Sequence, residues 1–219
     1  MRSDPPSRAS VPPGNTRFPG RRAWRAQLGY TDAMSTAAFM ALALTRPSLV
    51  GAVAPSSRHL ARAMNAQVGT ADALIELGAG TGAVTEALHR AAPARPLLAV
   101  ELQPDLAAGL QRRLPTIEMA CAPAHEVLAA RRALAPAATV VVSSLPFRSL
   151  PQPLRRETVD ALLGFLAEHP ARRLVQYTYQ PRAPFELPQD SALRWRLREV
   201  VWRNLPPAGV WVLAAAHPA

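Results

Sequence analysis

The spacing of apolar residues changes near residue 70, and the change separates two kinds of segment. Before it, apolar positions recur at helical spacing in three stretches, 21–30, 32–44 and 56–66. After it, short apolar or β-branched runs alternate with amphipathic stretches, which is typical of buried strands alternating with helices. Strands are predicted at 73–77, 97–102, 116–121, 139–143, 173–179, 195–202 and 209–215, and helices at 81–91, 105–114, 124–132 and 153–168.

Strand and helix alternate four times before the final strands, which predicts an α/β fold with a largely parallel sheet covered by helices on both faces. Residues 1–20 contain five prolines and two glycines and are expected to be extended or disordered. We therefore expect a Pro-rich tail at 1–20, a helical segment at 21–66 and an α/β domain at 67–219. The tryptophans of the last strands, at 195, 202 and 211, are expected in the core.

Positive charge is concentrated near the N-terminus. The 219 residues carry a net charge of +10, and all basic side chains are arginines. Residues 1–62 hold nine arginines and two aspartates, whereas 63–219 hold sixteen arginines and thirteen acidic residues. Such a segment suits a polyanionic surface, either nucleic acid or anionic lipid, and a solvated tail without a specific partner is the alternative.

The longest apolar stretch, 33–44, is shorter than the roughly 20 residues that a membrane-spanning helix needs, and it lies too far from the N-terminus for an ordinary secretory signal. We expect a cytoplasmic protein that is either soluble or peripherally bound to a membrane. The 21–30 stretch predicts a basic amphipathic helix of the kind that lies in a membrane surface. Its expected membrane contacts are Arg21, Arg22, Trp24, Arg25 and Leu28.

One cysteine, Cys121, excludes a disulfide framework and a multi-cysteine zinc site, and no histidine pair has zinc-ligand spacing, so no metal is expected.

A glycine-rich turn, residues 76–82 (Glu-Leu-Gly-Ala-Gly-Thr-Gly), joins the first predicted strand to its helix. The glycines permit a tight turn and close approach of a ligand, although a tight turn without a ligand is the alternative. Glu76 would repel a pyrophosphate but suits a cationic amino group. Glu101 ends the next strand, where a carboxylate accepts hydrogen bonds from ribose hydroxyls. A nucleoside that carries a cation, S-adenosylmethionine rather than NAD, is the indicated ligand.

This constellation resembles the class I S-adenosylmethionine-dependent methyltransferases over residues 50–217. The resemblance implies a Rossmann-like sheet of seven strands with an antiparallel last hairpin, preceded here by the N-terminal amphipathic helical extension. It also implies S-adenosylmethionine as methyl donor and S-adenosylhomocysteine as product. The donor-site residues expected on this basis are Ser56, Glu76, Gly78, Gly80, Thr81, Gly82, Glu101, Leu102, Cys121, Ala122 and Ser143.

Two donor contacts have alternatives. Many members of the class place an aspartate after the third strand to bind the adenine amino group, whereas residues 120–123 contain no acid here. The adenine would then be bound by backbone groups near Cys121 and Ala122, or by His125 and Glu126. For Ser56 the favoured interpretation is a cap for the helix that follows it, a role that Ser57 also suits.

The loop after the fourth predicted strand, Ser143-Ser-Leu-Pro-Phe147, lies where such folds bind substrate. It resembles the Asn-Leu-Pro-Tyr loop of the ribosomal RNA adenine dimethyltransferases but lacks the asparagine. The missing asparagine argues against the planar amino group of adenine as substrate, whereas an aliphatic amine remains a possible substrate. Backbone carbonyls around Leu145 would accept hydrogen bonds from such an amine.

Segments 53–57, 76–82, 143–147 and 176–181 together resemble the soluble bacterial phospholipid N-methyltransferases. The resemblance implies phosphatidylethanolamine and its methylated forms as substrates, converted towards phosphatidylcholine at an anionic membrane, with no nucleic acid partner. The alternatives are an RNA adenine N6-dimethyltransferase, a small-molecule methyltransferase and a non-catalytic binding module. The expected catalytic residues are Tyr177, Tyr179, Ser144, Leu145 and Phe147.

The three aromatic rings among these suit a cationic amine through cation–π contact, and a tyrosine hydroxyl can orient the amine or relay its proton. The alternative is that Tyr177 and Tyr179, two residues apart on one strand face, only pack against each other.

Overall fold

The structure, a computed structural model, describes residues 57–216, so the helices predicted at 21–30 and 32–44 lie outside the described residues. Its strands are β1 (Ala73–Leu77), β2 (Leu97–Val100), β3 (Glu118–Ala120), β4 (Thr139–Ser143), β5 (Arg173–Thr178), β6 (Leu193–Val201) and β7 (Ala208–Ala215). Its helices are α3 (Arg58–Ala66), α4 (Ala83–Ala91), α5 (Pro104–Arg113), α6 (Ala124–Arg131) and α7 (Gln152–Ala167).

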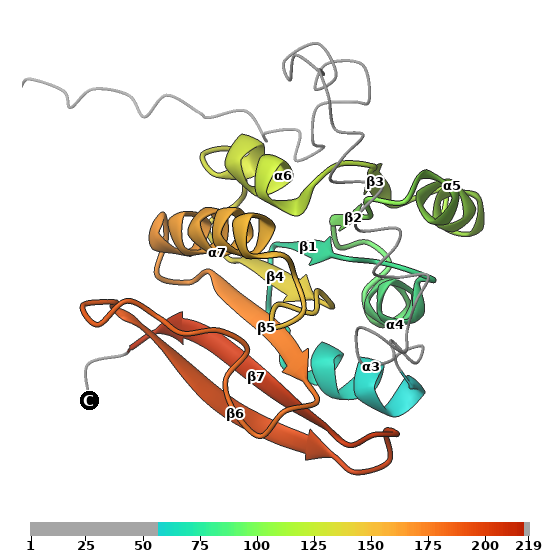
Figure 1. Ribbon diagram of the computed structural model, residues 1–219. Coiled ribbons are helices and arrows are strands. Elements are labelled where there is room, and N and C mark those ends of the chain that lie inside the picture. Colours follow the sequence, from blue (N-terminus) through green and yellow to red (C-terminus); the bar gives the residue numbers. More distant parts are fainter. Residues whose placement is uncertain (1–56, 217–219) are drawn as a thin grey trace, which may run out of the picture. The chain divides into compact units, whose positions relative to one another are not determined.

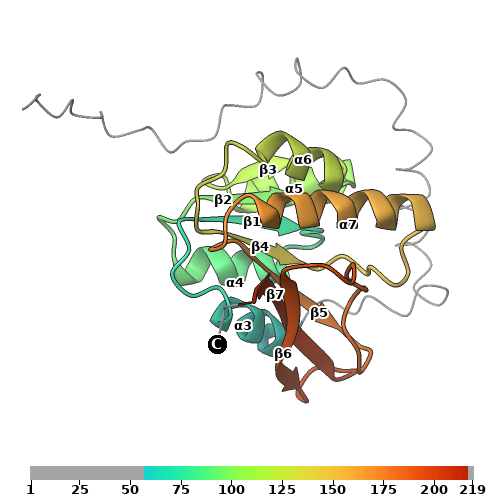
Figure 2. The ribbon, with the colours of Figure 1, turned by 90° about the vertical axis from the view of Figure 1, so that its left-hand side faces the viewer.

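The seven strands form one sheet in the order β3-β2-β1-β4-β5-β7-β6. Strands β1 to β5 pair in parallel, and β7 pairs antiparallel with both β5 and β6. Helices α3, α4 and α5 lie on one side of the sheet and α6 and α7 on the other (Figures 1 and 2). This is the Rossmann-like arrangement with an antiparallel last hairpin that the sequence predicts.

Burial on both faces explains the composition of the central strands. All five residues of β1 and all five of β4 are buried, and β4 is a β-branched run from Thr139 to Val142. β-branched side chains pack well on a pleated, fully covered surface, so the run needs no polar alternation. The bounds predicted for these two strands, 73–77 and 139–143, are the bounds observed.

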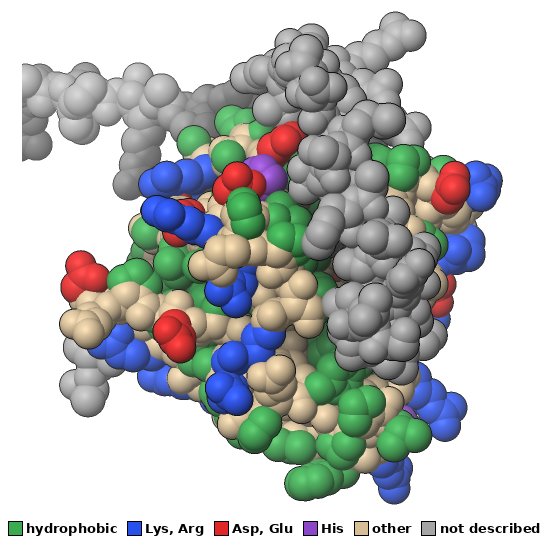
Figure 3. Space-filling model, viewed as in Figure 1, with side chains coloured by type: hydrophobic (Ala, Val, Ile, Leu, Met, Phe, Trp, Pro, Cys, Tyr) green, Lys and Arg blue, Asp and Glu red, His purple; other side chains and the backbone are tan. Residues whose placement is uncertain are grey.

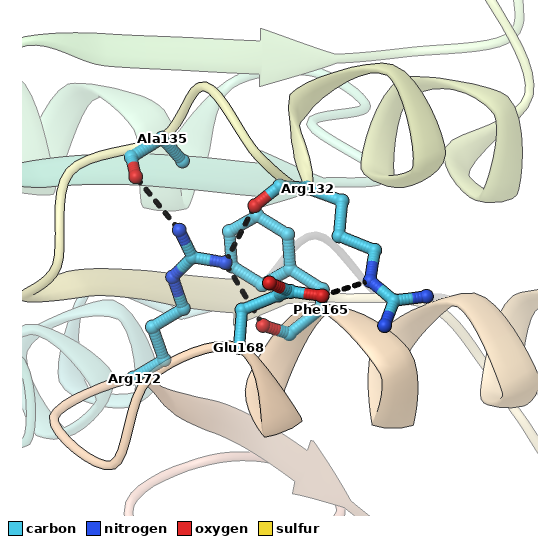
Figure 4. Close-up of polar contacts among 5 residues, drawn as sticks. All are labelled: Arg132, Ala135, Phe165, Glu168 and Arg172. Atoms are coloured by element: carbon cyan, nitrogen blue, oxygen red, sulfur yellow. Dashed lines mark hydrogen bonds and ion pairs between the residues drawn. The ribbon is translucent and has the colours of Figure 1, made fainter.

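Arg172, just before β5, is a buried arginine that joins three segments (Figure 4). Its Nη1 donates to the backbone oxygens of Arg132 and Phe165, at 2.8 and 3.0 Å, and its Nη2 donates to that of Ala135 at 2.7 Å. The guanidinium also lies over the Phe165 ring, 4.3 Å from the centroid. Burial lowers the pKa of Arg172, and nearby Glu168 opposes that shift. The residue thus ties α7 and the segment after α6 to the sheet.

The expectation that the three late tryptophans belong to the core is wrong for Trp202. Its side chain is 77% exposed, because it lies beyond the end of β6 in the turn to β7. Trp195 and Trp211 are partly buried within the hairpin, and Trp195 packs edge-on against Phe185 at 5.0 Å between ring centroids. Strand β6 is an edge strand, so side chains near its end have little to cover them.

Candidate functional site

The carboxyl ends of the parallel strands meet at one edge of the sheet, and the predicted site residues gather there. Backbone hydrogen bonds hold the loops side by side: Ser144 N donates to Leu77 O at 2.9 Å, and Glu101 N donates to Ala120 O at 3.0 Å. Ligands bind at this edge in open α/β sheets. The other predicted donor-site residues within the described part lie in the same loops or at their strand ends: Glu76, Gly78, Gly80, Thr81, Gly82, Leu102, Cys121, Ala122 and Ser143.

Ser56 and the five predicted membrane contacts lie outside the described residues. The helix start can still be compared with the prediction. Helix α3 is capped by Ser57, whose side chain accepts a hydrogen bond from Leu60 N at 3.2 Å.

The three glycines of the turn all have positive φ, but they face different surroundings. A Cβ on Gly78 would lie 2.9 Å from Leu145 Cδ2, and one on Gly82 would lie 2.5 Å from Leu110 Cδ1. A Cβ on Gly80 would meet nothing within 4 Å. Packing within the chain therefore favours glycine at positions 78 and 82, whereas Gly80 borders open space.

Glu101 holds the glycine turn from the neighbouring strand. Its carboxylate accepts hydrogen bonds from Gly80 N at 2.7 Å and from Gln103 N at 2.9 Å, and the residue is only 5% exposed. An ionised carboxylate has about four lone-pair sites, so acceptor capacity remains for hydroxyl groups. The Glu101 carboxylate can thus position the glycine turn and bind a diol at the same time.

Glu76 is fully buried at the end of β1, and neither of its carboxyl oxygens makes a hydrogen bond of ordinary geometry within residues 57–216. Burial raises the pKa of Glu76 to about 8; hydrogen bonding from the side chain and backbone of nearby Thr85 on α4 opposes the rise only in part, and Glu101 adds to it. A buried carboxylate without a partner is unfavourable, and a bound cationic group removes that cost. The site therefore fits a ligand whose amino group carries positive charge.

The predicted adenine contacts lie one strand further along the sheet. Cys121 is exposed after β3, and its Sγ lies 3.7 Å from Leu102 O, while Ala122 beside it is buried. His125 faces α7, with Nε2 3.6 Å from the Glu157 carboxylate.

A cavity of about 170 Å³ lies between the loop after β4 and the end of β5. All five predicted catalytic residues line it, so the structure brings together side chains from two separate segments. The lining residues are Ser144, Leu145, Pro146, Phe147, Arg148, Ser149, Gln176, Tyr177, Thr178, Tyr179, Gln180 and Pro184.

The aromatic rings of this cavity pack in two pairs. Tyr177 and Tyr179 lie edge-on with ring centroids 5.5 Å apart, and Phe147 lies edge-on to Phe185 at 5.0 Å. Phe147 is 2% exposed and Tyr177 7% exposed, so each ring is fixed by its neighbours. Phe185, in the loop between β5 and β6, is a residue that sequence reasoning missed, and no local pattern marks it.

Gln176 is a second residue whose role the sequence did not reveal, and it is 1% exposed. Its Nε2 donates to Leu145 O at 3.1 Å and to Tyr177 O at 2.7 Å. Leu145 O also accepts from Phe147 N at 2.9 Å, so both lone pairs of that carbonyl are engaged within the chain. Gln176 therefore fixes the loop after β4 against β5. A polar residue within an otherwise apolar strand was the available signal.

Several solved structures that resemble this chain in fold are methyltransferases. The 1,6-didemethyltoxoflavin-N1-methyltransferase of Burkholderia thailandensis, solved with its substrate and S-adenosylhomocysteine, matches with TM-score 0.58 at 13% identity, covering 84% of this chain and 89% of that one. A putative O-methyltransferase of Klebsiella pneumoniae matches with TM-score 0.54 at 15% identity, covering 89% and 94%. An rRNA methylase of Streptococcus thermophilus matches with TM-score 0.50 at 16% identity, covering 76% and 100%.

No protein-family model matches the chain, and no curated protein matches it. These likenesses establish the fold: the chain has the Rossmann-like methyltransferase fold. Within residues 57–216, no helix is long and apolar enough to cross a bilayer, and no three histidine, cysteine, aspartate or glutamate side chains are grouped to hold a metal ion.

Proposed function

We propose that the protein is an S-adenosylmethionine-dependent methyltransferase that methylates the amino group of phosphatidylethanolamine and its methylated forms at an anionic membrane surface. The observation that carries the donor assignment is the fully buried carboxyl group of Glu76 beside a glycine turn with open space at Gly80. The fold is shared with methyltransferases, one of which holds S-adenosylhomocysteine.

The donor-binding roles follow from the geometry at the sheet edge. Glu76 pairs with the amino group of the donor, because a cationic partner stabilises the ionised form of this buried carboxyl group. Glu101 accepts hydrogen bonds from the ribose hydroxyls while it holds Gly80 N. When bound, the donor supplies an electrophilic methyl group on a sulfonium.

The acceptor amine occupies the cavity between the loop after β4 and the end of β5. An amine must be neutral to attack the methyl group, and its product carries positive charge. The Tyr177 and Tyr179 rings favour a cation beside their faces, with about 0.5–2 kcal/mol per contact. The chain's contribution is mainly alignment of the amine with the donor and exclusion of water.

The lipid assignment rests on the acceptor loop and on charge. Ser144 stands where adenine dimethyltransferases carry asparagine, which disfavours a planar base amine and leaves an aliphatic amine as substrate. The positive N-terminal segment suits anionic lipid head groups, and residues 21–66 are proposed to dock there. The enzyme would then work in the cytoplasm at the inner membrane surface.

Transfer of labelled methyl groups to lipid tests the proposal. We expect the full chain to transfer label from S-adenosylmethionine to vesicles that contain phosphatidylethanolamine, and Glu76→Gln to abolish this transfer. The matched control is Asp160→Asn, which removes an exposed carboxylate on α7 and leaves activity unchanged. Label that enters RNA adenine and no lipid would establish the alternative, an RNA adenine N6-dimethyltransferase.

A further inference from the structure

Exposed hydrophobic side chains concentrate on β6 and its turn to β7. Within residues 57–216, the exposed large hydrophobic residues are Leu134, Leu197, Trp202 and Leu205, and three of these four lie on β6 or in the turn. Trp202 is 77% exposed and Leu205 86% exposed. We call the exposed turn residues the β6–β7 tip, which consists of Trp202, Arg203, Leu205, Pro206 and Pro207.

The tip is held in place by a buried residue at its centre. Asn204 is 3% exposed, its Oδ1 accepts from Ser57 N at 3.3 Å, and its Nδ2 donates to Pro206 O at 2.8 Å. The Asn204 backbone N–H donates to Val201 O at 3.2 Å. Because the turn is anchored inward at Asn204, the hydrophobic side chains on either side of it are presented outward in a fixed arrangement.

Strand β6 and the tip together hold the excess positive charge of the α/β domain, with Arg203 in the tip itself. From residue 63 to the C-terminus the chain has sixteen arginines and thirteen acidic residues, and residues 193–207 contain four of these arginines and one glutamate. The rest of that region has twelve of each and is neutral. Figure 3 shows arginine and hydrophobic side chains together over the β6–β7 turn, at the lower right.

The tip and the acceptor cavity lie at the same edge of the sheet. Gly209 of β7 is paired with Thr178 at the end of β5, and Val201 of β6 is paired with Ala208. Thr178 also lines the cavity. A surface in contact with the tip is therefore adjacent to the edge at which the proposed acceptor binds.

We propose that the β6–β7 tip inserts into the interface of an anionic lipid bilayer, as a membrane contact separate from the N-terminal segment. Tryptophan is favoured at the boundary between head groups and acyl chains, leucine is favoured deeper, and arginines attract anionic lipids. The proposal rests on the proposed function in taking the membrane as the enzyme's working surface.

Two other roles of this surface, protection of the sheet edge and binding of nucleic acid, explain fewer of its exposed residues than lipid contact does. Arginines on an edge strand protect it from pairing with other chains, but this leaves the exposed Trp202 and Leu205 without a reason. A single-stranded nucleic acid binds along a basic groove with aromatic platforms, whereas this surface is a turn with leucine and two prolines at its end. A lipid interface accounts for the exposure of Trp202 and Leu205 and for the positive charge of Arg203 together.

Sedimentation with vesicles gives the first test. We expect the full chain with Trp202→Ala and Leu205→Ala to bind phosphatidylglycerol-containing vesicles at least about tenfold more weakly than the unaltered chain. The matched control is Leu134→Ala, which removes a 65% exposed leucine outside the tip and leaves binding unchanged. Equal binding by the double variant and the unaltered chain would overturn the proposal.

An environment-sensitive fluorophore tests insertion itself, independently of binding by the N-terminal segment. In the full chain with Cys121→Ser, the label is attached at Leu205→Cys or, as control, at Leu134→Cys. We expect a blue shift at position 205 with phosphatidylglycerol vesicles and none at position 134. A label at 205 that does not respond while the protein sediments, or that responds only to RNA or to rising protein concentration, would overturn the proposal.

The two readouts also separate this proposal from the proposed function. A blue shift at position 205, with no methylation of phosphatidylethanolamine by the unaltered chain, keeps the membrane contact and refutes the lipid substrate. Methylation without that shift keeps the substrate and refutes the contact.

Discussion

Ionisation of Glu76 is expected to control donor affinity. In the free protein, burial raises the pKa of Glu76 to about 8, so the carboxyl group is mostly protonated below that pH. Pairing with the cationic amino group of the donor requires the ionised form. Donor binding below about pH 8 therefore releases a proton, and donor affinity rises with pH.

The magnitude follows from the pKa. If only the ionised form binds, the apparent dissociation constant exceeds its limiting value at high pH by the factor 1 + 10^(pKa − pH). With a pKa of about 8, this factor is about 100 at pH 6 and about 2 at pH 8. We therefore expect affinity for S-adenosylhomocysteine to increase about 50-fold between these pH values.

Calorimetry in buffers with different enthalpies of ionisation measures both the affinity and the released protons. We expect about one proton released per ligand bound near pH 6. Glu76→Gln should bind weakly with no such pH dependence, whereas Asp160→Asn should behave as the unaltered protein. Constant affinity from pH 6 to 8, with no proton release, would refute the pairing of Glu76 with the amino group.

The same pKa predicts how stability depends on pH without donor. The ordinary value for Glu76 is 4.5, and the folded-state value is about 8. Between these values the folded protein binds one more proton than the unfolded chain, so the free energy of unfolding falls as pH rises. Urea unfolding of Glu76→Gln should lack this part of the fall, and an identical pH profile for both proteins would contradict the assignment.

Three further substitutions separate packing from chemistry. Arg172→Leu removes the donor from three backbone oxygens, two of them in buried hydrogen bonds, and should lower the free energy of unfolding by about 3 kcal/mol, measured with urea, whereas exposed Arg156→Leu should change it little. Gly82→Ala should destabilise the fold because its Cβ would lie 2.5 Å from a leucine methyl, whereas Gly80→Ala should fold and lose donor affinity by calorimetry. Tyr177→Phe should keep donor affinity and slow methylation; an unchanged kcat would remove its chemical role.

Most of the fold was predictable because local patterns and burial agree. The predicted and observed bounds of β1 and β4 coincide, and the helix predicted at 124–132 is observed as Ala124–Arg131. Strand β2 ends at Val100 rather than at 102 because the carboxylate of Glu101 turns back to accept Gln103 N and Gly80 N. That bond depends on a side chain, which a hydrophobic pattern does not describe.

The candidate site was predictable where one segment carries it and not where distant segments meet. The glycine turn is one continuous segment of the sequence, and so is the loop after β4. The packing of Phe185 on Phe147 and the hydrogen bonds of Gln176 to the loop after β4 join segments far apart in the chain. Likewise, the exposure of Trp202 follows from the position of β6 at the sheet edge, which spacing alone did not reveal.

A competition experiment tests the central claim most directly. The full chain is given labelled S-adenosylmethionine together with vesicles containing phosphatidylethanolamine and with ribosomal RNA in the same mixture. We predict that the label is recovered in the phosphatidylethanolamine head group and that Glu76→Gln transfers none. Label recovered only in RNA, or a donor that does not bind, would contradict the account.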